Sequence, residues 1–144
     1  MHLSQQRLLI ACGAVLFLLG LLTGFAIPAF LNPRMGLASH LEGVMNGTFL
    51  IALGAVWANV SLAPVWARIA FWLLIYGSFA NWVFISLAAA LGTSELTPIA
   101  GKGFTGSPLA EQAVSLGLVS VGVTMVAGCA LVVWGLLRKP QGAT

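Results

Sequence analysis

Four long apolar segments follow one another along the chain, separated by short stretches rich in proline, glycine and polar residues. A helix needs about 20 apolar residues to cross the hydrocarbon core of a membrane, and each segment reaches that length. The expected helices cover residues about 8–27, 40–60, 67–91 and 108–137. The pattern therefore predicts an all-α fold, an integral membrane four-helix bundle that forms a single domain over residues 1–144.

Residues that start or stop helices mark the ends of these segments. Pro28, Asn32 and Pro33 end the first helix and begin a short loop. Ser107 suits the N-cap of the fourth helix, and Pro108 suits its first position. Only a few residues join the second and third helices, so we expect these two helices to be antiparallel neighbours.

The composition is that of a membrane protein and excludes an ordinary soluble domain. Hydrophobic residues make up 60% of the chain and charged residues 6%, whereas soluble proteins average about 25% charged residues. The net charge of +3 comes from basic residues near helix ends, so we expect membrane lipid and no nucleic acid as a partner. One side carries Arg7, Arg68, Arg138 and Lys139, and the other carries Arg34 and Lys102. This asymmetry predicts a multi-pass membrane protein with cytoplasmic termini.

A polar cluster lies where the second apolar segment begins. Within residues 39–47 the chain places His40, Glu42 and Asn46. Polar groups inside a membrane are costly unless they are paired or used, so the cluster is a candidate functional site. The alternative is that His40 and Glu42 are interfacial residues that only mark the start of the helix.

The helical repeat divides this cluster between two faces. At about 100° per residue, Glu42 and Asn46 share one face, and His40 points about 120° away from Asn46. Gly43 and Gly47 lie on the face of His40, where they would leave open space for a large flat ligand beside the imidazole. The alternative is that this GxxxG pair admits a neighbouring helix, as such pairs usually do.

The third apolar segment adds two polar candidates. Asn81 lies about 15 Å from the outer end of its helix and Asn46 about 9 Å below His40, so the two amides are expected at similar depth. Tyr76 lies deeper by more than one turn, where an aromatic residue more often serves packing than chemistry. The candidate catalytic residues are Asn46, Asn81 and Tyr76, and the candidate cofactor-binding residues are His40, Gly43 and Gly47.

The residue types that the chain lacks limit the chemistry. It has three acidic residues, none of them expected in the middle of a helix, which disfavours paired-carboxylate catalysis and proton-coupled transport. It has no Asp, so a Ser-His-Asp set is excluded. One internal imidazole suits axial ligation of a metal or a haem better than a metal site built by the protein alone.

Three strings of residues resemble the bacterial hydroxylaminobenzene mutases. They are Asn-Pro-Arg-Met-Gly-Leu at 32–37, Ser-His-Leu-Glu-Gly-Val-Met-Asn-Gly at 39–47 and Tyr-Gly-Ser-Phe-Ala-Asn-Trp at 76–82. These mutases are small four-helix membrane enzymes that convert arylhydroxylamines to aminophenols. The resemblance implies an isomerase that rearranges hydroxylaminobenzene, a small aromatic hydroxylamine, to 2-aminophenol by intramolecular hydroxyl transfer.

A more distant resemblance is to the styrene oxide isomerases, four-helix membrane proteins that bind haem b at the subunit interfaces of a trimer. Their His, followed six residues later by Asn-Gly, matches His40, Asn46 and Gly47. The match implies that His40 is the axial ligand of the iron of haem b and that Asn46 is an amide of the distal pocket. It also implies a homotrimer, and glycine stripes on the first two helices offer close-packing surface for one.

The third helix departs from the pattern of the isomerases. Ala80-Asn81 matches, but Gly77 and Ile85 stand where those isomerases carry an Asp and a Tyr. A one-residue gap would place Tyr76 opposite the Asp, and nothing replaces the Tyr. We therefore expect hydroxyl transfer with haem iron as a Lewis acid, and poor isomerisation of epoxides. The alternatives are a haem b epoxide isomerase, an electron-transfer cytochrome without a second axial His in its helices, and a structural or transport bundle without chemistry.

Overall fold

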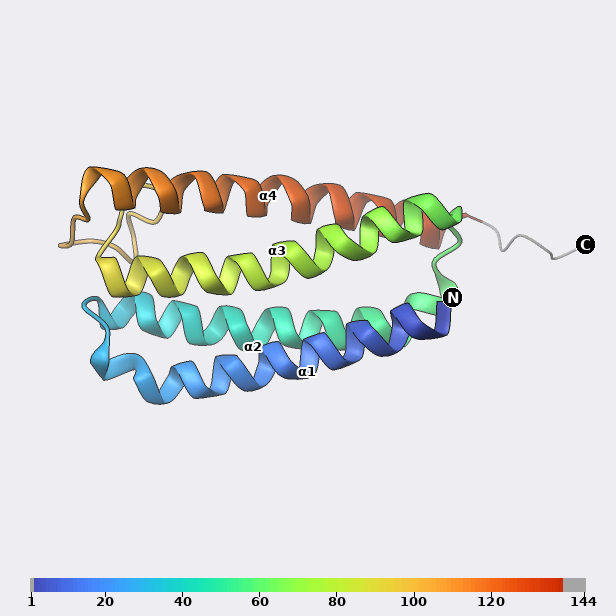
Figure 1. Cartoon of the computed structure of the whole chain (residues 1–144), viewed down its shortest axis with the longest axis horizontal. Helices are drawn as coiled ribbons and strands as arrows, with labels where there is room; N and C mark the ends of the chain where they lie inside the picture. Colours follow the sequence, from blue (N-terminus) through green and yellow to red (C-terminus); the bar gives the residue numbers. More distant parts are fainter. Residues whose placement is uncertain (1, 139–144) are drawn as a thin grey trace, which may run out of the picture.

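The computed structural model describes residues 2–138, with side chains from Gln5 onward. Its helices are α1 (His2–Ala26), α2 (Pro33–Val56), α3 (Pro64–Leu91) and α4 (Pro108–Leu137), with short 3₁₀ helices at Ile27–Ala29 and Trp57–Asn59. The four α-helices run side by side, with α1 next to α2 and α3 next to α4 (Figure 1). No β-strand occurs in the described residues, and the predicted all-α four-helix bundle is confirmed.

All four α-helices are long and apolar enough to cross a membrane. The α1–α2 and α3–α4 loops lie at one end of the bundle, and the α2–α3 connection lies at the other end with the start of α1 (Figure 1). Arg34 and Lys102 meet at the first end, where the Arg34 guanidinium donates to the Lys102 carbonyl oxygen. The two basic residues assigned to this side from the sequence are therefore together, whereas Lys139 of the other side lies outside the described residues.

The predicted helix ends are correct for α4 and differ mainly at the starts of the other helices. Residues 108–137 form α4, as predicted. By contrast, α1, α2 and α3 begin at His2, Pro33 and Pro64 rather than at about 8, 40 and 67, and α2 ends at Val56 rather than at about 60. Polar residues that precede the apolar run are part of α1, whereas α2 and α3 each begin at a proline, which suits the first position of a helix.

The early start of α2 changes the interpretation of the polar cluster. The Asn32 side-chain oxygen accepts from the Met35 backbone N–H at 3.2 Å, and Pro33 takes the first helical position, which suits its fixed φ. Asn-Pro is also a turn signal, which explains the late predicted start. His40 and Glu42 lie about 11 and 14 Å inside α2, so they do not merely mark its start. The expectation that no acidic residue lies in the middle of a helix is wrong for Glu42, which is the tenth of the 24 residues of α2.

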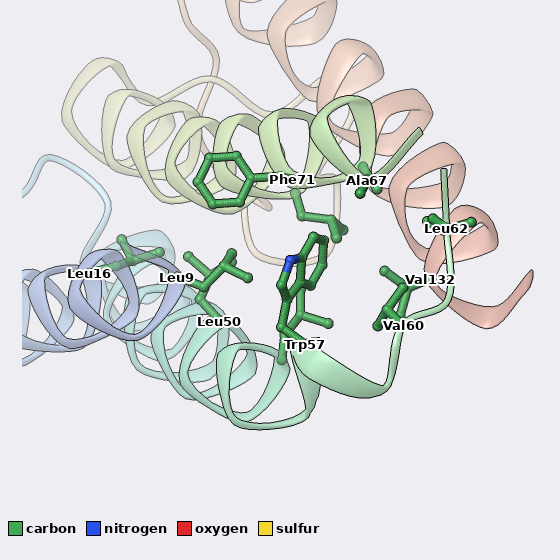
Figure 2. Packing of buried hydrophobic residues seen from close by; sticks show 12 residues of the cluster. Leu9, Leu16, Leu50, Trp57, Val60, Leu62, Ala67, Phe71 and Val132 are labelled. Carbon is green, nitrogen blue, oxygen red and sulfur yellow. The ribbon is translucent and has the colours of Figure 1, made fainter. Parts of the chain in front are cut away.

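Two apolar clusters hold the bundle on either side of this polar region. Near the α2–α3 connection, the indole of Trp57 points into the first cluster and meets the ring of Phe71 edge-on, with centroids 6.3 Å apart (Figure 2). Near the opposite end, Met35 and Ile85 belong to the second cluster. Along α2 and α3, the polar residues lie between these clusters, so apolar packing on both sides fixes their depth.

Facing glycines bring α1 and α2 into backbone contact. A Cβ atom on Gly43 would lie 2.5 Å from the Cα of Gly20, and one on Gly47 would lie 2.5 Å from the backbone nitrogen of Phe17. The expected open space beside Gly43 and Gly47 is therefore wrong, because α1 fills it. The pair admits a neighbouring helix, which was the alternative interpretation.

We expect Gly20→Val to destabilise the bundle and Gly122→Val on α4 to leave it nearly unchanged. A Cβ on Gly20 would meet the Val44 nitrogen at 2.6 Å, whereas no atom lies within 4 Å of a Cβ on Gly122. Forcing extra atoms into a packed contact costs about 1–3 kcal/mol. Thermal unfolding in mild detergent compares the two variants, and equal melting temperatures would contradict the close α1–α2 contact.

The loop between α3 and α4 is fastened across one end of the bundle. The Glu111 carboxylate accepts from the backbone N–H groups of Ser94 and Gly106 at 3.0 and 2.9 Å. The Asn32 side-chain nitrogen donates to the Ala100 carbonyl oxygen at 2.9 Å. Asn32 therefore both caps α2 and holds this loop. These contacts fix the position of the loop relative to the start of α2.

Candidate functional site

Glu42 joins the two amides that were expected at similar depth. Its Oε2 atom accepts from Nδ2 of Asn81 on α3 at 2.6 Å and from Nδ2 of Asn46 on α2 at 3.1 Å. Because a carboxylate oxygen only accepts, both amides turn their nitrogen atoms toward it. Asn46 and Asn81 therefore lie at similar depth, as expected, with Glu42 as the link between α2 and α3.

His40 is held from the opposite side, by α1. Its Nδ1 lies 2.8 Å from the carbonyl oxygen of Gly20, which can only accept, so the hydrogen sits on Nδ1 and Nε2 keeps its lone pair. The ring lies against Gly24, where a Cβ would come within 2.9 Å of Nδ1. Gly43 and Gly47, the other expected cofactor-binding residues, are buried under α1 and offer no surface to a ligand.

One atom of His40 and one atom of Glu42 remain available to a ligand. Among the described residues, buried side-chain nitrogen and oxygen atoms without a hydrogen bond occur only at Ser78 and Thr93. Nε2 of His40 and Oε1 of Glu42 form no hydrogen bond with the described residues, yet neither is among those buried atoms. Both atoms therefore reach the surface of the chain.

His40 and Glu42 point to opposite sides of α2 at nearly the same depth. The two side chains are two residues apart, and each residue turns the helix by about 100°, so they diverge by about 160° measured the shorter way around. Along the helix axis they differ by about 3 Å. The contacts agree, because His40 meets α1 and Glu42 meets α3. A compact ligand on a single chain cannot touch both side chains.

Tyr76 lies apart from the other candidate catalytic residues. Its hydroxyl oxygen is 2.7 Å from the Oγ of Ser120 on α4, and its side chain is exposed. Five residues along α3 turn it about 140° away from Asn81. The structure therefore brings together two of the three candidates, Asn46 and Asn81, and leaves Tyr76 on the face toward α4.

Sequence reasoning missed a second set of polar contacts at the same depth. The indole N–H of Trp82 donates to Oγ1 of Thr23 at 3.1 Å, and that hydroxyl donates to the Leu19 carbonyl oxygen at 2.8 Å. The hydroxyl oxygens of Ser39 and Ser86 lie 2.6 Å apart and link α2 to α3. Their positions in the sequence do not pair these residues, and only a comparison of depths across helices would have found the contacts.

The donor set at His40 fits a haem. Among the described residues, no group of three or more His, Cys, Asp and Glu side chains comes together to hold a metal ion. His40 instead presents one imidazole nitrogen at the surface, while a backbone carbonyl fixes its ring through the other nitrogen. One axial nitrogen is sufficient for a haem, because the porphyrin supplies the ligands in its own plane.

Comparisons with known proteins show the family of the chain. The family model of styrene oxide isomerase matches residues 5–137. Two relatives from Ectopseudomonas oleovorans align over 135 residues, 93% of this chain: hydroxylaminobenzene mutase HabB is 46% identical over 82% of its own length, and hydroxylaminobenzene mutase HabA is 45% identical over 100% of its length. No solved structure matches the chain significantly. The chain therefore belongs to the styrene oxide isomerase family, in the group that contains the hydroxylaminobenzene mutases.

Proposed function

We propose that this protein is a hydroxylaminobenzene mutase, an isomerase that moves the hydroxyl group of an arylhydroxylamine from nitrogen to the ortho carbon of the ring. The observation that carries this proposal is the cluster of Glu42, Asn46 and Asn81 within the apolar part of the bundle. Relatives that are 45 and 46% identical bear that name. The protein resides in the bacterial inner membrane with cytoplasmic termini, where an apolar aryl substrate is concentrated.

The two amides position the substrate. Asn46 and Asn81 each donate a nitrogen-bound hydrogen to Glu42, which leaves the amide oxygens to accept from the N–H or O–H of a hydroxylamine. Holding the migrating hydroxyl beside the ring makes its transfer intramolecular, which lowers the entropic part of the barrier. The apolar helices around the cluster exclude water, so the hydroxyl returns to the ring instead of exchanging with solvent.

His40 is the residue that holds haem b. Its Nδ1 contact with Gly20 fixes the ring, and its Nε2 atom faces outward for ligation. When bound, the haem supplies a Lewis acid that weakens the N–O bond of the substrate. Tyr76 has no part in this site, because its hydroxyl is directed to Ser120.

The complete site forms between copies of the chain in a homotrimer. His40 and Glu42 lie at one depth on opposite faces of α2, so Nε2 of one copy and Oε1 of the next can face the same ligand. Such a head-to-tail contact closes into a ring when the rotation between copies allows it. The site is incomplete in one chain.

We expect the purified protein to convert phenylhydroxylamine to 2-aminophenol without added reductant or oxidant. In water enriched in ¹⁸O, the product should stay unlabelled, because the hydroxyl oxygen comes from the substrate. Mass spectrometry of the aminophenol gives both results. No aminophenol, or aminophenol that carries solvent oxygen, would contradict the proposed function.

A haem b epoxide isomerase is the second candidate, because the matching family model is named for that activity. Gly77 faces Met125 and Thr124 of α4, and Ile85 is buried in the second apolar cluster. Neither supplies an acid or a phenol beside Asn81. Styrene oxide offered to the same preparation should therefore give little phenylacetaldehyde, and rapid aldehyde formation without aminophenol would move the assignment to the epoxide isomerases.

A further inference from the structure

Both amides of the cluster bind the same oxygen atom of Glu42. Asn81 and Asn46 donate to Oε2, at 2.6 and 3.1 Å, and neither donates to Oε1. Oε1 has no hydrogen bond with the described residues and reaches the surface. The contacts of Oε2 alone are sufficient to link α2 to α3. Oε1 therefore has no part in this structural role.

The rearrangement needs a proton to move after the hydroxyl has moved. When the N–O bond breaks and the new C–O bond forms, the ortho carbon carries both a hydrogen and the hydroxyl group, and the nitrogen is an imine. To reach 2-aminophenol, that carbon must lose its proton and the nitrogen must gain one. General acid–base groups speed such transfers by about 10²- to 10⁴-fold.

We propose that Oε1 of Glu42 carries this proton from the ortho carbon to the nitrogen of the substrate. This inference rests on the proposed mutase function. The carboxylate takes the ring proton, and the electron pair of the broken C–H bond restores the aromatic ring. The electrons of the imine double bond then form the new N–H bond with the same proton. Glu42 returns to its starting form, and no oxidant, reductant or further reactant is consumed.

The remaining acidic residues do not suit this role. Glu111 is engaged by backbone N–H groups of the α3–α4 loop, including those of Ser94 and Gly106. Glu95 is an exposed residue of that loop. Glu42 is the acid that stands inside an apolar helix beside two side-chain amides, and those amides hold the carboxylate in one place while its free oxygen stays open to the substrate.

The test is the isotope effect of phenylhydroxylamine that carries deuterium at both ortho carbons. With the wild-type protein, proton removal is fast, so labelled and unlabelled substrate should react at nearly the same rate. Glu42→Gln keeps the size of the side chain and an oxygen that accepts from both amides, but it has no carboxylate. We expect it to be about a hundredfold slower and to show a primary isotope effect, since proton removal now limits the rate.

Controls separate this role from a structural one. Glu95→Gln makes the same substitution in the loop and should keep the wild-type rate and isotope effect. Two results would overturn the proton-transfer role. One is a folded Glu42→Gln protein that is slow but shows no isotope effect, and the other is a Glu42→Gln protein that is as fast as wild type. If Glu42→Gln does not fold, the test uses Glu42→Asp instead. We expect this variant to be slower than wild type and to show a larger isotope effect. Glu42→Asp with the rate and isotope effect of wild type would refute the role. A wild-type protein that forms no aminophenol refutes the mutase function itself.

Discussion

We expect the His40→Ala variant to lose the Soret absorption of bound haem and to form aminophenol only at the background rate, while its four helices remain folded. His40 donates through Nδ1 to the Gly20 carbonyl oxygen and leaves Nε2 free, which is the arrangement of a metal-binding imidazole. Among the described residues, no group of three or more His, Cys, Asp and Glu side chains comes together to hold a metal in its place. Absorption spectra and activity of wild type and variant, purified side by side, measure both effects.

The control for this variant is Thr48→Val on the same helix. Thr48 is exposed and donates its hydroxyl hydrogen to the Val44 carbonyl oxygen of its own helix, away from His40 and Glu42. It should keep the haem and the activity. Circular dichroism and elution volume show whether His40→Ala is still a folded bundle. A folded His40→Ala protein that keeps both haem and activity would remove His40 from the site.

Two variants with little or no activity should restore each other's activity when they assemble together. His40→Ala lacks the imidazole and Glu42→Gln lacks the carboxylate, but the two residues point about 160° apart on α2 and serve different sites. In a ring of three copies, a site works when one copy contributes an intact His40 and the next contributes an intact Glu42. In every ring that contains both variants, one of the three sites meets both conditions, so isolated mixed oligomers should regain about a third of wild-type activity.

Co-expression of the two variants with different affinity tags provides the measurement. Mixed oligomers are isolated by sequential purification on both tags, and each variant expressed alone with both tags is the control. Mixed oligomers as inactive as the single variants would contradict a site shared between copies. In that case His40 and Glu42 either act in one chain or do not act in one site.

The length of the apolar segments was sufficient to predict the bundle, because crossing a membrane depends on the length and hydrophobicity of each single segment. It was insufficient to place the start of α2. That start depends on whether Asn32 caps a helix or opens a turn, and the bond to the Met35 backbone N–H decides for the cap. This one local choice turns Glu42 from a residue at a helix start into a residue within the helix.

The sequence by itself determined four apolar helices, the division of His40 and Asn46 between two faces of one helix, and the similar depth of Asn46 and Asn81. These properties follow from the helical repeat within single segments. Only the tertiary structure decided that Glu42 receives both amides, that α1 covers Gly43 and Gly47, and that Tyr76 turns toward Ser120. Each of these depends on which helix packs against which face, and that choice is made by contacts between segments far apart in the chain, which no local pattern contains.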